Sequence, residues 1–484
     1  MRIFLSGNTC KSHATLSTIN SPLSTINYSL GLVATSVFRY YVWNYFLLSD
    51  FVIFRSFFSN GMITKEVVLT GLGVLSPVGL DKESFGQALL EAQSGIGFLN
   101  IQTSNHALRP MGSEVPDFHA KDFVKPRKNI KVMSRDIQLA FVSACHASTD
   151  AGLVTEGNSR TVDPERLGVI FGSDLIGAEV DMLLDAFRSG IHNGQYNFDQ
   201  WGTDAMNEVF PLWMLKFLPN MPACQISIGH DARGPSNSIT LCRGSSLAAI
   251  IEAVRTIKRG AADVMIAGGC GNRINQDFQT RIKSYFVAPR QQDPNRVPRP
   301  FDIDRCGSIL GEGSGAFVLE RREFAEARGA KIYATIRGFA EVNEPNLHKT
   351  RPTGNAIRNS IRFALQRASL TPNDIGFVNA DGIGTEYDDR IEAEAIQDVL
   401  GNVPVTSNKG NFGDLGSGTG AVELVSTILS LQDGRIPPTR NHEKTAPDCP
   451  INVVHGKPAT FSSSFVLKLN QTRMGRSFAL ILEK

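Results

Sequence analysis

The chain has 484 residues, of which 42% are hydrophobic and 20% are charged. This composition is typical of a globular protein, and the length suffices for one large core or two fused cores. The formal net charge of +2 gives no bulk electrostatic argument for nucleic-acid binding. The seven cysteines form no CxxC pair and no metal-ligand spacing. We therefore expect a reducing cytoplasm, with neither a disulfide framework nor a metal site.

Residues 1–61 differ from the rest of the chain because they are rich in Ser, Thr, Asn and aromatic residues. A membrane anchor is one interpretation, but Arg39, Asp50 and Arg55 interrupt the apolar stretch. No uncharged run therefore reaches the roughly 18–20 residues that a membrane span needs. We predict an extension outside the fold, or translation from a start codon placed too early, because Met62 directly precedes the first convincing strand.

The first half of the ordered pattern alternates short apolar runs with helical periodicity. A buried strand begins at residue 66, and a helix pattern follows at 82–93. The runs at 167–173 and 262–269 contain glycine near their ends and suit central strands that are covered on both faces. Between them, residues 245–260 place their apolar side chains at helical spacing and end in glycine.

The pattern restarts near Lys331. Strands are expected at 331–342, 375–382, 404–408 and 476–484, and helices at 354–370, 390–401 and 420–434. Two successive α/β halves suggest an internal duplication, and their alternating strands and helices predict a layered architecture. We place the halves at 62–320 and 321–484. No low-complexity linker divides them, so we expect them to pack as one body.

Five segments occur in a characteristic order: TGLGVLSPVG, GPSNSITLCRGSSLAAIIEA, RPFDIDRCGSILGEGSGAFVLE, VNADGIGTEYDDRIEAEAI and SNKGNFGDLGSGTGAVEL. Together they resemble the β-ketoacyl-[acyl-carrier-protein] synthase family of the thiolase-like superfamily. The resemblance covers about Lys65 to Lys484. It implies an α/β, thiolase-like layered αβαβα fold built from two related halves, usually in a homodimer. It also implies an acyl chain that an acyl carrier protein delivers on its phosphopantetheine arm.

By this resemblance, the chemistry needs a cysteine nucleophile at a helix start, two histidines and a lysine. Aligned without gaps, the nucleophile position falls on Arg243, and Cys242 lies one residue earlier. The two histidine positions fall on Asp381 and Asp414, whereas the lysine remains as Lys409. The catalytic set is therefore replaced at three of its four positions.

Three interpretations of these residues stay open. Cys242 is a candidate nucleophile if the turn shifts by one residue, but such a shift reverses side-chain direction, so we favour a core thiol. Asp381 and Asp414 could act as bases, although as anions they would repel a developing enolate unless protonated. We favour a buried cluster in which the two carboxylates compensate Arg243 and Lys409, because a buried guanidinium alone is costly.

The loop near the C-terminus is altered as well. The family expects Gly-Phe-Gly-Gly after Ser464-Phe465, where a backbone N–H helps to form the oxyanion hole, but this chain has Val-Leu-Lys-Leu. On the same resemblance, Phe465 and Leu467 are candidate substrate-binding residues. The glycines of 416–420 lack a Walker lysine or a dinucleotide pattern, so we interpret them as turn residues and expect no cofactor.

The basic run 121–135 resembles part of the surface on which the family docks its acidic carrier protein, and a solvated helix face is the alternative.

Three hypotheses about function follow. The first is a non-condensing, chain-length-factor-like subunit of fatty-acid or polyketide biosynthesis, paired with itself or with an active ketosynthase. The second is an active 3-oxoacyl-[acyl-carrier-protein] synthase, an acyltransferase that uses Cys242. The third is an acyl-binding protein. In each case we expect a cytoplasmic protein without a membrane span and without a nucleic-acid partner.

Overall fold

The computed structural model describes residues 65–99, 110–154, 159–177, 180–275, 286–289, 293–344 and 351–484. The extension expected at residues 1–61 lies outside the described residues and stays a prediction. Within the described ranges, no helix is long and apolar enough to cross a membrane.

Within the described residues, one sheet of eleven strands runs through the fold, and its first part comes from the N-terminal half. The strands lie side by side in the order β7-β4-β8-β9-β1. Their bounds are β1 (Val67–Leu75), β4 (Leu167–Ser173), β7 (Ser236–Thr240), β8 (Val264–Asn272) and β9 (Glu312–Arg321). β4 pairs in parallel with β7 and β8, whereas β9 pairs antiparallel with β8 and β1.

The C-terminal half repeats this arrangement in the order β12-β11-β16-β17-β10, with a short β14 at the edge. The bounds are β10 (Ala334–Asn343), β11 (Ile375–Asn379), β12 (Pro404–Thr406), β14 (Asn452–Val453), β16 (Phe465–Gln471) and β17 (Arg476–Glu483). β11 pairs in parallel with β12 and β16, and β17 pairs antiparallel with β16 and β10. Because strand order and direction match in both halves, the expected duplication and the α/β fold class are confirmed.

β1 and β10 join the halves through an antiparallel pairing at Val68–Thr335 and Leu69–Ala334. Two buried helices, α7 (Ser245–Lys258) and α13 (Thr419–Asp433), form the central layer. Their apolar side chains share one core with residues of β1, β9, β10 and β17. This shared core explains why the halves pack as one body.

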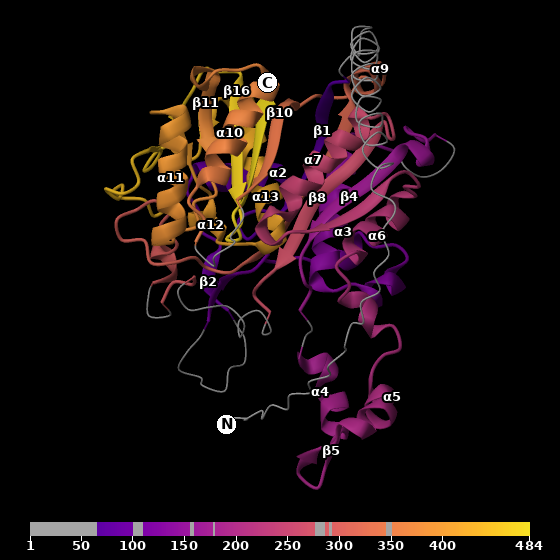
Figure 1. The fold of residues 1–484 in the computed structure, drawn as a ribbon. Helices are drawn as coiled ribbons and strands as arrows, with labels where there is room; N and C mark the ends of the chain where they lie inside the picture. The colour runs from indigo at the N-terminus through magenta and orange to yellow at the C-terminus, as the bar shows by residue number, and fades with distance from the viewer. Residues whose placement is uncertain are drawn as a thin grey trace, which may run out of the picture. The chain divides into compact units, whose positions relative to one another are not determined.

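The outer helices cover the opposite faces of the two half-sheets (Figure 1). On the first half they are α3 (Arg135–Asp150) and α6 (Met221–His230). On the second half they are α10 (Asn355–Ala368) and α11 (Glu386–Leu400). Each face therefore has its own apolar cluster, and the layers alternate helix, sheet, helix, sheet, helix.

The strands β7 and β9 and the helices α3 and α6 were not among the predicted elements, and two further differences have a clear local cause. α11 begins at Glu386 rather than at 390, because the Thr385 side chain caps the backbone N–H of Asp388. β16 was not expected, because Lys468 and Asn470 obscure its apolar pattern. The remaining predicted strands and helices lie within a few residues of the observed ones, α2 (Lys82–Leu90) among them.

Candidate functional site

The turn between β7 and α7 carries Cys242 and Arg243 with opposite environments. Cys242 has a φ of 50°, in the left-handed region, and its side chain is exposed. Arg243 is 3% exposed and points into the interior. The Ser245 hydroxyl holds this turn by accepting from the Leu241 N–H at 2.8 Å and donating to the Cys242 carbonyl at 2.7 Å. The expected core thiol at Cys242 is thus corrected, because the left-handed turn directs that side chain outward.

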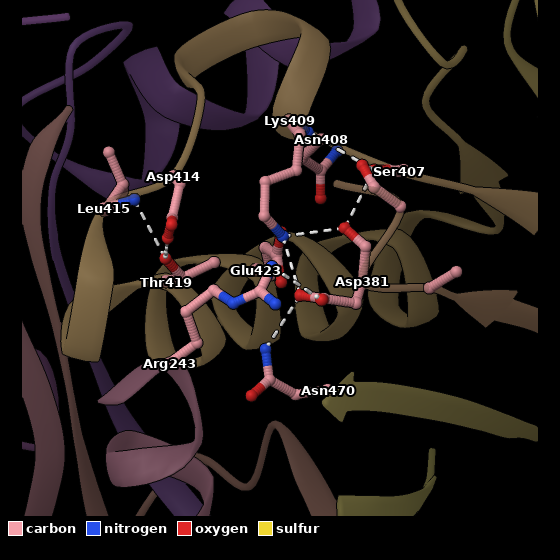
Figure 2. A network of polar contacts seen from close by, with 12 residues as sticks. Arg243, Asp381, Ser407, Asn408, Lys409, Asp414, Leu415, Thr419, Glu423 and Asn470 are labelled. Carbon is pink, nitrogen blue, oxygen red and sulfur yellow. Dashed lines mark hydrogen bonds and ion pairs between the residues drawn. The ribbon is translucent and has the colours of Figure 1, made fainter. Parts of the chain in front are cut away.

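Arg243 enters a buried network that also holds Asp381 and Lys409 (Figure 2). Arg243 Nη1 lies 3.2 Å from Asp381 Oδ2. Lys409 Nζ donates to Asp381 Oδ1 at 2.9 Å and to Glu423 Oε1 at 2.6 Å. Asn470 Nδ2 donates to Asp381 Oδ1 at 3.0 Å. The structure therefore brings together three residues that the sequence placed in one cluster, and it adds Glu423.

The charges of this network stabilise one another. Burial disfavours the charged form of Arg243, but the carboxylates of Asp381 and Asp414 raise its pKa. Burial likewise acts to raise the pKa of Asp381, yet Arg243 and Lys409 outweigh it and lower that pKa. Asp381 is therefore ionised at neutral pH and offers no proton to an acyl group.

Asp414 lies beside the network but has a different direct partner. Its Oδ2 is 3.1 Å from Arg273 Nη1, and Arg273 Nη2 is 3.0 Å from Asp174 Oδ2. Its Oδ1 accepts from the Gly416 N–H at 3.0 Å and so fixes the turn before α13. The expectation that Arg243 is held by both carboxylates is corrected, since Asp414 acts on it only through the electrostatic field.

Glu392 holds the backbone of the loop that contains Asp381. Its two carboxyl oxygens accept from the backbone N–H groups of Asp381 and Gly382, each at 2.8 Å. Burial, reinforced by the negative charge of Asp381, raises the pKa of Glu392 to about 8. At neutral pH this carboxyl carries a proton, so it adds no negative charge to the network.

Lys468 occupies the segment where the glycine run was expected. Its Nζ lies 2.7 Å from Glu423 Oε2, and the side chain is fully buried. The strand that carries it, β16, is paired on both sides, with β11 and with β17. Its backbone N–H groups thus belong to a regular sheet interior, not to a glycine loop.

Phe465 and Leu467 are not brought to this network. Both pack in the apolar cluster that α10 and α11 form on the outer face of the second half-sheet. Their role in substrate binding stays a prediction.

Two family models match the chain. The N-terminal domain of β-ketoacyl synthases matches residues 64–325, and the C-terminal domain matches residues 333–443. The chain belongs to the β-ketoacyl synthase family. The 3-oxoacyl-[acyl-carrier-protein] synthase 2 of Synechocystis is 33% identical, over 81% of this chain and 92% of its own length. The enzyme of the same name from Vibrio cholerae is 34% identical, over 78% and 89%.

Solved structures agree with this assignment. A β-ketoacyl synthase from Burkholderia phymatum has a TM-score of 0.76 and 26% identity, over 87% of this chain and 99% of its own. The ishigamide ketosynthase/chain length factor has a TM-score of 0.75 and 27% identity, with the same coverage. The fold is therefore the thiolase-like fold of the ketosynthases, and the family serves fatty-acid and polyketide synthesis.

In this family member, sequence reasoning missed four ionic partners: Asp174, Arg273, Glu423 and Lys468. A signal for the last two was present. Glu423 interrupts the apolar helix pattern of α13, and Lys468 interrupts an apolar strand. Charged residues of this kind are almost never fully buried unless they are paired.

No group of three or more His, Cys, Asp or Glu residues in the described part of the chain is arranged to hold a metal.

Proposed function

We propose that the chain is a non-condensing, chain-length-factor-like subunit of fatty-acid or polyketide biosynthesis. One observation carries this proposal: the position that aligns with the family nucleophile holds Arg243, buried and ion-paired with Asp381 at 3.2 Å. A guanidinium cannot form a thioester, and an ionised carboxylate cannot stabilise an enolate oxyanion. The residues that would replace the catalytic set instead neutralise one another.

The test is intact-mass spectrometry after incubation with acyl-loaded carrier protein, alongside an assay for β-ketoacyl product. We expect neither an acyl adduct nor product from the chain alone, and product only when an active ketosynthase is added. A stoichiometric acyl adduct on Cys242 would refute the proposal.

The second candidate is an active synthase that uses Cys242. It is favoured by the exposure of Cys242 at the turn before α7, where a nucleophile could meet a substrate. Against it, burial by the surrounding protein, assisted by the Asp174 carboxylate, raises the pKa of this thiol. Less of the thiol is then ionised at neutral pH, and the thiolate is the reactive form.

A carrier protein is the partner that the proposal requires. A solved structure that shares this fold is described as an acyl-carrier protein in complex with its ketosynthase, at 24% identity and a TM-score of 0.72. On this chain, the candidate docking residues are the exposed cations of the 121–135 run: Lys121, Lys125, Arg127, Lys128 and Lys131. Their charge suits an acidic partner.

We further propose that the subunit forms a dimer, with itself or with an active ketosynthase. β7 is the outermost strand of the first half-sheet, and three of its five residues are exposed. An unprotected edge strand can pair with another chain. We also predict that the apolar run 262–269 lies near this interface, and β8, which contains most of that run, is two strands further inside than β7. Sedimentation that shows only monomer, with and without an active synthase, would count against a dimer.

A further inference from the structure

Cys242 and Arg243 line a cavity of about 610 Å³ at the seam of the two halves. The first half contributes the turn before α7 together with Arg273 and Phe286. The second half contributes the end of β10 and the β16–β17 turn, from Thr472 to Arg476. The volume lies within the range of about 300–1,000 Å³ that is usual for small-molecule sites.

The cavity wall carries an excess of positive charge. Four arginines line it, Arg243, Arg273, Arg473 and Arg476, against one carboxylate, Glu344. Glu344 already accepts from the backbone and the hydroxyl of Thr353. The carboxylates that balance the arginines, Asp381 and Asp414 among them, lie behind the wall and do not line the cavity.

Arg243 lines the cavity, and its guanidinium, which points inward from the wall, keeps unused donors. Both of its terminal nitrogens are buried and make no hydrogen bond to any described residue, although Nη1 is ion-paired with Asp381. Arginine has five N–H donors in a planar fork, and buried donors normally find an acceptor. A planar carboxylate matches this fork with two parallel hydrogen bonds.

Apolar side chains line the same cavity as Arg243. Leu241 and Phe286 line it, and Met474, which is 76% exposed, stands at the rim. The Phe286 ring lies over the guanidinium, with its centroid 5.6 Å from Arg243 Cζ and 5.1 Å from Arg473 Cζ. A carboxylate that approaches Arg243 would therefore meet the Phe286 ring, and the alkyl chain attached to it would contact these apolar side chains.

We propose that this cavity binds an unesterified acyl chain noncovalently, with its carboxylate on Arg243 and its alkyl chain along Leu241, Phe286 and Met474. The inference rests on the proposed non-condensing function, since a thioester on Cys242 would fill the same space. No bond forms or breaks in this binding. The exchange of a nucleophile for a guanidinium would then turn an acyl-transfer site into a receptor for a free acyl carboxylate.

Calorimetric titration of the whole chain with eight-carbon probes tests the proposal. We expect octanoate to bind at least about tenfold more tightly than octanol, because only the carboxylate can accept charge-assisted hydrogen bonds. Octyltrimethylammonium should bind more weakly than octanol, because the wall repels it. Octanoyl-pantetheine has the same acyl chain without the carboxylate, and it should also bind less tightly than octanoate. Equal affinity for octanoate and octanol would overturn the proposal.

Two variants test whether the carboxylate of bound octanoate lies on Arg243. Arg243→Gln removes the planar fork, and we expect it to abolish the preference for octanoate over octanol. The matched control is Arg476→Gln at the rim, whose guanidinium lies 3.5 Å from Glu341, and there the preference should persist. Loss of the preference in the control, with retention in Arg243→Gln, would refute the placement. If Arg243→Gln does not fold, the wild-type probe series still decides.

Failure here and failure of the proposed function have different signatures. A covalent acyl adduct on Cys242 would refute the non-condensing function whatever the affinity for octanoate. Unselective binding of octanoate, without an adduct, would refute the carboxylate site and leave the non-condensing function standing.

Discussion

Arg243 and Cys242 are neighbours in the chain, yet one closes a buried ion network and the other reaches solvent. The left-handed φ of Cys242 decides between them, because it turns one side chain out and the next one in. The Arg243 guanidinium forms an ion pair with Asp381, and Asp381 forms a second ion pair with Lys409. At this scale the site is a set of mutually dependent charges whose stability comes from pairing and not from any single contact.

The pairing of Arg243 with Asp381 can be measured by a double-mutant cycle. Arg243→Met should destabilise the fold by about 3–5 kcal/mol, because it leaves a buried charge without its partner. The double mutant Arg243→Met with Asp381→Asn should lose less stability than the sum of the losses in the two single mutants. The difference should be about 1–3 kcal/mol. Urea unfolding gives the free energies. Asp414→Asn is the comparison, since its direct partner is Arg273 and it acts on Arg243 only through the electrostatic field, so its coupling to Arg243→Met should be smaller. Strict additivity for the first pair would show that these residues are not coupled.

Cys242 should react slowly with iodoacetamide. The thiolate is the reacting form, and the surrounding protein raises the pKa of this thiol. We expect its alkylation at pH 7.5 to be slower than that of a free thiol such as reduced glutathione. Peptide mapping by mass spectrometry, with Cys242→Ser as the control, measures the rate at this position. Rapid stoichiometric labelling of Cys242 would favour the synthase hypothesis.

Glu392 should make stability depend on pH. Its pKa is raised from 4.5 in the unfolded chain to about 8 in the folded protein, by burial and by Asp381. The folded state therefore holds a proton that the unfolded state has lost, and this contribution to stability declines as pH rises from about 4.5 to about 8.

The check is urea unfolding from pH 5 to pH 8, in which Glu392→Gln should show a smaller decline than the wild type. At pH 5 the variant should be less stable than the wild type by about 1 kcal/mol, since an amide offers one acceptor oxygen to two N–H groups, and this deficit should shrink as pH rises. Identical declines in the two proteins would refute the assignment.

The residue-level site was partly predictable from sequence. The ungapped alignment placed Arg243, Asp381 and Lys409 together, because strand ends and helix starts converge in this fold. It could not assign the partner of Asp414, since Arg273 follows β8 and lies far away in the chain. It also missed the outward turn of Cys242, because a single left-handed residue leaves no mark on apolar periodicity.

At the scale of elements, β16 matters most. Four residues without a glycine make it a regular strand between β11 and β17, and Lys468 anchors it to Glu423 on α13. Sequence reasoning recognised the missing glycines but not the strand, because Lys468 breaks the apolar run. The helices α7, α10 and α13 were predictable because their apolar residues recur at helical spacing over many turns.

The pairing of β16 on both sides bears on the expected activity of a variant that carries a cysteine at position 243. We expect Arg243→Cys to form no β-ketoacyl product, because β16 is paired on both sides and offers no glycine loop as an oxyanion donor. A radiolabelled-malonyl condensation assay measures this, with an active family member as the positive control. Condensation by this single variant would show that Arg243 alone prevents the reaction.

At the scale of the whole molecule, the two halves repeat one strand order and share one core. This was the most predictable level, because each half shows the same alternation of strand and helix. The described sheet and its covering helices lie within residues 65–484, and the family models begin at residue 64.

Residues 1–61 should therefore be dispensable. A chain that starts at Met62 should be expressed in soluble form. Its free energy of unfolding should equal that of the whole chain within about 1 kcal/mol. Circular dichroism during urea titration compares the two. Loss of folded protein on truncation would show that the extension belongs to the fold.

The buried network also bears on folding and on the history of the duplication. When the adjoining ion pairs of Arg273 are included, the first half supplies Arg243, Arg273 and Asp174, one positive charge in excess. The second half supplies Lys409, Lys468, Asp381, Asp414 and Glu423, one negative charge in excess. The pairs Arg243–Asp381 and Arg273–Asp414 each join one half to the other, so each half supplies counter-ions to its neighbour. We expect this exchange of counter-ions to make the two repeats unfold together.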